Sequence, residues 1–259
     1  MTISSKIARL ADLTSVVCVR ISQYLSGSPS RYRAETEPFP EVDVRSQPDI
    51  FLLEVGSLLQ HTGKEQREFG HGRILYDKIL QLSDSLPPDL HLNVLEFGTA
   101  RGFSCVVMAK ALHDSQRSGS VVSIDIIRHD SNSYTARNRP SEIRYPRSYL
   151  MSPWKALVDD RVFFLAGPSS LALEILQSRR FPFVFIDEHH VYKNTKRDLR
   201  FASMCQVPGD MILLDDHSPK FPGVVRAVEE FVQSGTYESE KIALSTDRNM
   251  MLLTRRSTS

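Results

Sequence analysis

Hydrophobic positions follow a strand–helix alternation from about residue 92 onward. Short apolar runs, several of which end in acidic residues, alternate with longer stretches of helical periodicity. Continuous apolar strands separated by helices indicate a parallel sheet that is covered on both faces. The predicted strands are Leu92–Phe97, Val121–Ile126, Arg161–Leu165, Phe181–Asp187 and Met211–Asp215. The predicted helices are Ser104–His113, Ser169–Ser178, Lys193–Met204 and Gly223–Ser234.

The last part of the chain predicts two more strands, Lys241–Ser245 and Met250–Thr254, with a turn at 247–249. Together the pattern predicts an α/β fold with a Rossmann-like open sheet. This sheet is mostly parallel, ends in an antiparallel C-terminal hairpin strand and carries helices on both faces.

The first part of the chain has a different pattern. Apolar residues at steps of three and four from Ile3 to Tyr24 predict a helix, and four prolines within residues 26–49 predict an extended connector. Two further helices are expected near 50–61 and 71–83. We therefore predict an N-terminal helical extension over residues 1–69 and a catalytic domain over 70–259. The first helix either packs on its own domain or makes a homo-oligomer contact.

Composition excludes several classes of protein. The 259 residues are 41% hydrophobic and 24% charged, with a formal net charge of +1, which argues against a dedicated nucleic-acid binder. The three cysteines form no CxxC pair, so neither a disulfide framework nor a zinc knuckle is expected. The sequence also predicts neither a membrane span nor a signal peptide, and hence a cytoplasmic protein.

A glycine-containing turn joins the first predicted strand to the first helix of the sheet region. Gly98 permits a tight turn, Gly102 permits close approach of the backbone to a ligand, and Ser104 is positioned to cap the helix. The dinucleotide fingerprint GxGxxG is not matched, and the carboxylate of Glu96 would repel phosphates and attract a cation. A purely structural strand–turn–helix is the alternative.

Acidic residues and histidines follow the next two predicted strands. Asp187, Asp215 and Asp216 are expected to meet at the carboxyl ends of the sheet, and a divalent cation would relieve their mutual repulsion. Mg²⁺ suits the oxygen donors best, whereas the adjacent His189 and His190 also permit Mn²⁺ or Fe²⁺. The alternative is that only Asp187 has a function, as a residue near the cofactor.

The segment Val-Leu-Glu-Phe-Gly-Thr-Ala-Arg-Gly-Phe-Ser (94–104) resembles the first motif of the class I S-adenosylmethionine-dependent methyltransferases. The resemblance continues at Asp125, which in the family ends the second strand and binds the ribose hydroxyls, and at Leu-Ala-Gly-Pro-Ser-Ser (165–170), which flanks the adenine. It implies S-adenosylmethionine as cofactor. The residues that it implies for cofactor binding are Glu96, Gly98, Thr99, Gly102, Ser104, Asp125, Gly167, Ser169 and Asp187.

Two further motifs, Ile-Asp-Glu-His-His-Val-Tyr (186–192) and Leu-Leu-Asp-Asp-His (213–217), resemble the metal-dependent branch that includes macrocin and mycinamicin O-methyltransferases. Catechol O-methyltransferases use a related metal arrangement. The resemblance implies that Asp187, Asp215 and Asp216 hold the metal. It also implies that His190, or else His189, is the catalytic base.

Residues 126–160 are rich in arginine and aromatic residues, including Arg128, Arg144, Arg147 and Trp154. Such a stretch is suited to bind a glycoside or an anionic acceptor, and a solvated surface loop is the alternative. His71 and Arg73 are weaker candidates to face the cofactor pocket.

These observations predict a metal-assisted O-methyltransferase that acts on a hydroxyl group of a small molecule, such as a sugar, a polyketide or another natural product. An NAD(P)-binding oxidoreductase and a non-catalytic cofactor-binding protein on the same fold are the alternatives.

Overall fold

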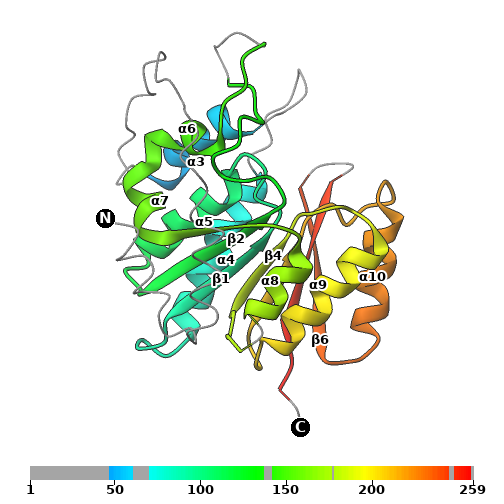
Figure 1. Ribbon diagram of the computed structural model, residues 1–259. Coiled ribbons are helices and arrows are strands. Elements are labelled where there is room, and N and C mark those ends of the chain that lie inside the picture. The colour runs from blue at the N-terminus through cyan, green and yellow to red at the C-terminus, as the bar shows by residue number, and fades with distance from the viewer. Residues whose placement is uncertain (1–46, 61–69, 137–141, 177, 245–247, 258–259) are drawn as a thin grey trace.

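A seven-stranded sheet forms the centre of the protein, with the strand order β3-β2-β1-β4-β5-β7-β6 (Figure 1). The computed structural model describes residues 47–60, 70–136, 142–176, 178–244 and 248–257. The strands are β1 (Leu92–Phe97), β2 (Gly119–Asp125), β3 (Val162–Ala166), β4 (Phe183–Ile186), β5 (Met211–Leu214), β6 (Tyr237–Ala243) and β7 (Asn249–Arg255). The helices are α3 (Pro48–Leu59), α4 (Gly70–Ser85), α5 (Phe103–Asp114), α6 (Arg147–Leu150), α7 (Lys155–Arg161), α8 (Ser169–Leu176), α9 (Tyr192–Met204) and α10 (Pro222–Val232), with a 3₁₀ turn, η1, at Ser152–Trp154.

The five apolar runs are parallel strands, as predicted. Strand β1 lies at the middle of the parallel part and pairs with β2 on one side and with β4 on the other. All four residues of β4 and of β5 are buried, which explains their continuous apolar sequence. The observed strands differ from the predicted bounds by a few residues at their ends.

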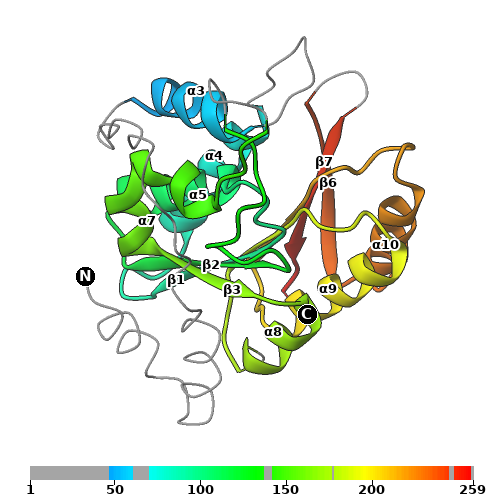
Figure 2. The same ribbon diagram turned by 45° about the horizontal axis from the view of Figure 1, so that its top comes forward.

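Helices cover both faces of the sheet and create two hydrophobic cores (Figure 2). Neighbouring residues of a strand point to opposite faces, so Val94 belongs to the core with α3, α4, α5 and α7, whereas Leu95 belongs to the core with α9 and α10. The predicted Rossmann-like sheet with helices on both faces is therefore confirmed.

Helix α3 is part of the first core. Its residues Phe51, Leu52, Val55 and Leu59 are buried in the same cluster as the apolar face of α5. The region predicted as an N-terminal extension thus contributes to the core of the sheet domain. The helix predicted over residues 3–24, with its proposed oligomer contact, lies outside the described residues.

The C-terminal hairpin is antiparallel, as predicted, but its first strand begins earlier than expected. Strand β7 inserts between β5 and β6, with Ile212 opposite Leu253 and Lys241 opposite Met251. The edge strand β6 begins at Tyr237 and exposes charged side chains, which discourages pairing with another chain. The first part of β6 was not predicted because it carries the charged residues Glu238 and Glu240 and is therefore not an apolar run.

The stretch of residues 126–160, called the insertion below, contains helical segments and buried side chains among its described residues. Of its residues that the structure describes, 147–160 contain α6, η1 and most of α7, and Tyr145 pairs with Tyr134 as an isolated bridge. Trp154 is fully buried, and only 1% of the Arg147 side chain is exposed. The aromatic residues therefore anchor this insertion in the first core.

Among the described helices, none has the length and apolar character required to cross a bilayer.

Candidate active site

The loops that follow β1, β2, β4 and β5 lie together at the carboxyl edge of the sheet. The backbone N–H of Asp187 donates to the carbonyl of Phe97 (2.9 Å), and that of Asp215 donates to the carbonyl of Ile186 (3.1 Å). These bonds continue the sheet ladder into the loops. Since the strand order changes direction between β1 and β4, this edge is the crevice where open α/β sheets bind ligands.

The turn after β1 needs its glycines. Gly98 has φ +96°, and a Cβ atom there would lie 2.1 Å from the carbonyl oxygen of Asp187. Gly102 has φ +98° and is itself the N-cap residue of α5. The expected capping role of Ser104 is therefore wrong, because the helix begins at Phe103 and places Ser104 in its first turn.

Ser104 instead serves a buried carboxyl group. Its hydroxyl donates to one oxygen of Glu96, and Ser123 donates to the other. Thr99 completes the chain through a bond to Ser123 (2.6 Å between the two oxygens). Glu96 is completely buried, and this burial raises its pKa to about 7, although the two serine hydroxyls act in the opposite direction. Glu96, Thr99 and Ser104 thus form the inner support of the glycine turn.

Asp125, at the end of β2, is held by the insertion. Arg147 donates to its Oδ2 (2.8 Å), and the backbone N–H of Ala100 donates to the same oxygen (2.8 Å). Arg147 also donates to the carbonyls of Ala100 (2.6 Å) and Ile127 (3.3 Å). The buried guanidinium therefore joins the glycine turn, strand β2 and the insertion, and is unavailable for direct acceptor binding.

The residues predicted after β3 lie on the other side of β2. The backbone N–H of Gly167 donates to the carbonyl of Asp125 (2.9 Å). Ser169 begins α8, and its hydroxyl donates to Glu188 (2.8 Å). Arg197 contacts both of these side chains. The expected adenine segment is thereby fixed to the loop after β4.

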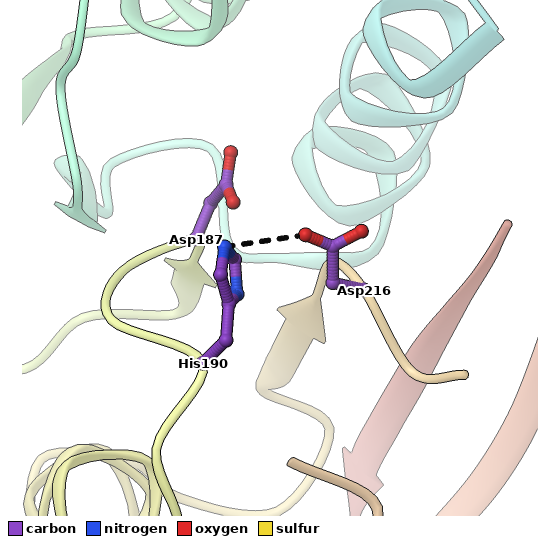
Figure 3. A group of neighbouring side chains, drawn as sticks. All are labelled: Asp187, His190 and Asp216. Carbon is purple, nitrogen blue, oxygen red and sulfur yellow. Dashed lines mark ion pairs between the residues drawn. The ribbon is translucent and has the colours of Figure 1, made fainter. Parts of the chain in front are cut away.

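Two carboxylates and an imidazole converge at the ends of β4 and β5 (Figure 3). One ligand atom from each of Asp187, His190 and Asp216 lies within 4.8 Å of the other two. Nε2 of His190 lies 3.3 Å from Oδ2 of Asp216. His190 has φ +32° and Asp216 has φ +57°, backbone conformations that are uncommon for residues other than glycine.

The electrostatics of this cluster favour a bound cation. Burial raises the pKa of Asp187 well above its ordinary value, and the neighbouring carboxylates of Asp215 and Asp216 raise it further. Burial and Asp215 also raise the pKa of Asp216, against the opposing effect of His190. A cation placed between these carboxylates would replace repulsion with attraction.

Asp215 is predicted to bind the metal, but in the structure its carboxylate is already paired with an arginine. Its side chain is 1% exposed and forms an ion pair with Arg248, whose Nε donates to Oδ1 (3.2 Å). Oδ1 also accepts the backbone N–H of Asp216 (2.7 Å). Among the described acidic and histidine residues, the group that could hold a metal contains His190 in place of Asp215. The reason lies in the strand order, which brings Arg248 of the C-terminal hairpin next to β5.

The two adjacent histidines have different surroundings. His189 is exposed, whereas His190 packs on the ring of Phe221 (4.4 Å between centroids) and faces Asp216. Geometry therefore favours His190 over His189 as the functional histidine.

No site role was predicted from the sequence for Arg248 or Phe221, because their contacts with Asp215 and His190 join residues far apart in the chain. Of the two weaker candidates, His71 is buried against Phe103 and Arg73 pairs with Asp49 and Asp77 on the surface.

Comparison with known proteins agrees with this architecture. Residues 95–217 match a family described as a methyltransferase domain (Methyltransf_24). No curated protein matches the chain.

Solved structures share the fold at low sequence identity. The O-methyltransferase from Bacillus cereus in complex with SAH is 17% identical, with a TM-score of 0.53, over 91% of this chain and 97% of that one. TomG from Streptomyces achromogenes, in complex with SAM, is 17% identical, with a TM-score of 0.52, over 92% and 95%. The O-methyltransferase NovP is 18% identical, with a TM-score of 0.54, over 82% and 100%.

Residues 95–217 therefore match a methyltransferase domain, and the solved structures that share the fold are O-methyltransferases. The oxidoreductase alternative is set aside, because the glycine turn lacks the dinucleotide fingerprint and the matched domain is that of a methyltransferase.

Proposed function

We propose that the protein transfers a methyl group from S-adenosylmethionine to a hydroxyl oxygen of a small molecule, assisted by a divalent cation. The observation that carries this proposal is the convergence of Asp187, His190 and Asp216 at the carboxyl edge of the sheet. A sugar, a polyketide or another natural product is the acceptor class that we favour. TomG, which shares the fold, is described as involved in tomaymycin synthesis.

The residues at the cluster fit a divalent cation. Asp187 and Asp216 offer carboxylate oxygens, and both carboxyl groups have raised pKa values because they are partly buried and lie near other acidic groups. Arg248 already neutralises Asp215, so we assign Asp215 a structural role next to the metal site and not the role of a ligand. Mg²⁺ suits the oxygen donors, and Mn²⁺ or Fe²⁺ becomes favourable if His190 also binds. A divalent cation supplies stabilisation of negative charge that develops on an acceptor oxygen.

We assign the cofactor to the crevice between β1 and β4, where open α/β sheets bind ligands. The cofactor supplies the methyl group on its sulfonium centre. Gly98 allows the turn after β1 to lie close to the loop after β4, and Gly102 allows it to lie close to Met151. Asp125 presents a carboxylate at the end of β2. Buried hydrogen bonds that involve Glu96, Thr99 and Ser104 fix the conformation of this turn. Gly167 and Ser169 position the segment after β3 in the same way.

His190 is the group that we assign to proton removal from the acceptor. The carboxylate of Asp216 orients its imidazole, and Phe221 restricts the ring from one side. An oriented imidazole next to a carboxylate is a suitable general base near neutral pH. Most of the remaining acceleration would come from holding the acceptor oxygen in line with the methyl group.

The test of the metal site is Asp216→Asn, with Asp77→Asn on the exposed face of α4 as control. Titration calorimetry with Mn²⁺ and Mg²⁺ is expected to show saturable binding to the wild type and to the control, and none to Asp216→Asn. Methyl transfer should require the metal and should be lost in this variant. Full turnover of Asp216→Asn in the presence of a chelator would contradict the metal-assisted mechanism.

His190→Ala distinguishes the two roles open to this histidine. A general base predicts retained metal binding with turnover reduced at least about 100-fold. A metal ligand predicts that metal affinity falls together with turnover. His189→Ala is the matched control, and we expect it to retain most activity because that side chain is exposed.

A further inference from the structure

Arg101 occupies an unusual position in the glycine turn between β1 and α5. Its side chain extends toward the insertion, where Nη2 donates to the hydroxyl of Thr135 (2.9 Å). The guanidinium carbon lies 5.9 Å from the centre of the Tyr134 ring. The residue is half-buried, so its charge has lost part of its hydration.

Within the described part of the chain, Arg101 forms no ion pair, unlike the other half-buried or buried arginines near the site. Arg147 pairs with Asp125, Arg248 with Asp215, and Arg197 with Glu188 and Asp198. Among the described residues, two titratable groups act on Arg101: Tyr134 raises its pKa, and the cation Arg144 lowers it. Burial lowers the pKa of Arg101 more than Tyr134 raises it, and no carboxylate is among the described groups that act on this guanidinium.

A partly desolvated cation without a counter-charge is unfavourable unless a ligand supplies one. The guanidinium group is suited to bidentate hydrogen bonding with a carboxylate or a phosphate. Arg101 is one residue from Ala100, whose N–H and carbonyl both contact the Asp125–Arg147 pair. It therefore lies on the turn that borders the proposed cofactor crevice.

We propose that Arg101 binds an anionic group of a bound ligand, with Arg144 adding positive potential. The anion is either the carboxylate of the amino-acid part of the cofactor or a carboxylate or phosphate carried by the acceptor. This inference rests on the proposed function. It adds a specificity-determining residue that recognises the negative charge of a bound ligand.

The experiment compares Arg101→Gln with the wild type by titration calorimetry, using two ligands. S-adenosylhomocysteine carries the carboxylate, whereas 5′-methylthioadenosine lacks it and keeps the adenosine and the thioether. We expect Arg101→Gln to bind S-adenosylhomocysteine about 10- to 100-fold more weakly and to bind methylthioadenosine unchanged, because one charge-assisted contact is lost. Arg101→Lys should recover part of the affinity. Arg226→Gln, an exposed residue of α10, is the control.

A second titration examines the other source of the anion. Inorganic phosphate is added to protein saturated with S-adenosylhomocysteine. If the acceptor supplies the anion, phosphate binds to the wild type and not to Arg101→Gln, while affinity for S-adenosylhomocysteine is unaffected.

Two outcomes overturn the inference. One is that Arg101→Gln changes neither binding event. The other is an equal loss of affinity for S-adenosylhomocysteine and methylthioadenosine, which would mean that Arg101 only stabilises the loops through Thr135 and Tyr134. Failure of the wild type to bind S-adenosylhomocysteine would contradict the proposed function itself, and with it the cofactor as the source of the anion.

Discussion

Asp187, Asp215 and Asp216 have similar positions in the sequence, each directly after an apolar strand, yet their neighbours differ. Arg248 neutralises Asp215, whereas Asp216 faces His190 and Asp187 lies between carboxylates. The free energy of an ionised aspartate that loses hydration on burial depends on whether a nearby cation compensates for that loss. The same residue type can therefore be neutralised by an ion pair at one position and remain next to other carboxylates at a neighbouring one.

Glu96 allows a prediction about pH and stability. Its pKa is about 7 in the folded protein, against an ordinary value of 4.5, because it is buried. The folded state therefore retains the proton over a range in which the unfolded state has lost it. Stability attributable to Glu96 should be fully present below about pH 4.5 and should decrease as pH rises to 7, by about 3 kcal/mol in total.

Glu96→Gln removes this titration while keeping a similar shape. Urea unfolding of the variant and of the wild type at several pH values measures the difference. We expect the variant to gain stability relative to the wild type between pH 5 and pH 8. A constant difference across this range would show that the carboxyl group does not titrate between the two states.

Gly98→Ala tests the close approach of two loops. The new Cβ would lie 2.1 Å from a backbone oxygen of Asp187, in addition to the strain of a positive φ. Gly209→Ala is the control, since Gly209 has φ +89° but nothing within 4 Å of the added atom. We expect a loss of about 1–2 kcal/mol in the control, from the strain alone. Gly98→Ala should lose at least about 2 kcal/mol more and should weaken cofactor binding.

Thermal or urea unfolding of both variants measures the comparison. Equal destabilisation would indicate that the loop after β4 moves away at little cost, and that Gly98 is required only for its backbone conformation.

At the scale of elements, the arrangement of side chains at the carboxyl edge depends on hydrogen bonds between loops. Arg147 of α6 donates such bonds to the glycine turn, to the end of β2 and to the hydroxyl of Tyr134 within the insertion. Because this guanidinium is fully buried, its bonds are not exchanged with water. Order in the insertion and the position of Asp125 are therefore expected to change together.

Arg147→Met tests this connection. It removes the charge but keeps much of the side-chain length, and it leaves Asp125 with little exposure and no cation. Breaking a buried ion pair in this way costs about 3–5 kcal/mol. We expect faster proteolysis within the insertion and weaker binding of S-adenosylhomocysteine. Arg128→Gln, in an exposed pair with Asp130, should change neither quantity. Unaltered proteolysis in Arg147→Met would contradict the coupling.

At the scale of the whole molecule, two cores enclose one sheet, and α3 extends the first of them (Figures 1 and 2). Phe51 of α3 is fully buried, near the ring of Trp154 from the insertion (6.4 Å between centroids). Helix α3, the insertion and α5 therefore belong to a single packed layer. This layer is expected to unfold together with the sheet.

Phe51→Ala should destabilise the whole protein by about 3–5 kcal/mol in a single cooperative transition. Leu53→Ala on the same helix is the matched control, because its side chain is 57% exposed and its loss should change stability by no more than about 0.5 kcal/mol. Circular dichroism during urea unfolding distinguishes the outcomes. A separate early transition caused by Phe51→Ala would mean that α3 folds independently of the sheet domain.

Sequence pattern was sufficient to predict the alternating strands and helices, the parallel sheet with its terminal hairpin, and the clustering of carboxylates at one edge. These features follow from local periodicity and from the rule that parallel strands end on the same side. The pairing of Arg248 with Asp215, the position of His190 next to Asp216, and the burial of Arg147 were decided by the tertiary structure. Each depends on contacts between residues far apart in the chain, and periodicity carries no information about which distant side chain supplies the compensating charge.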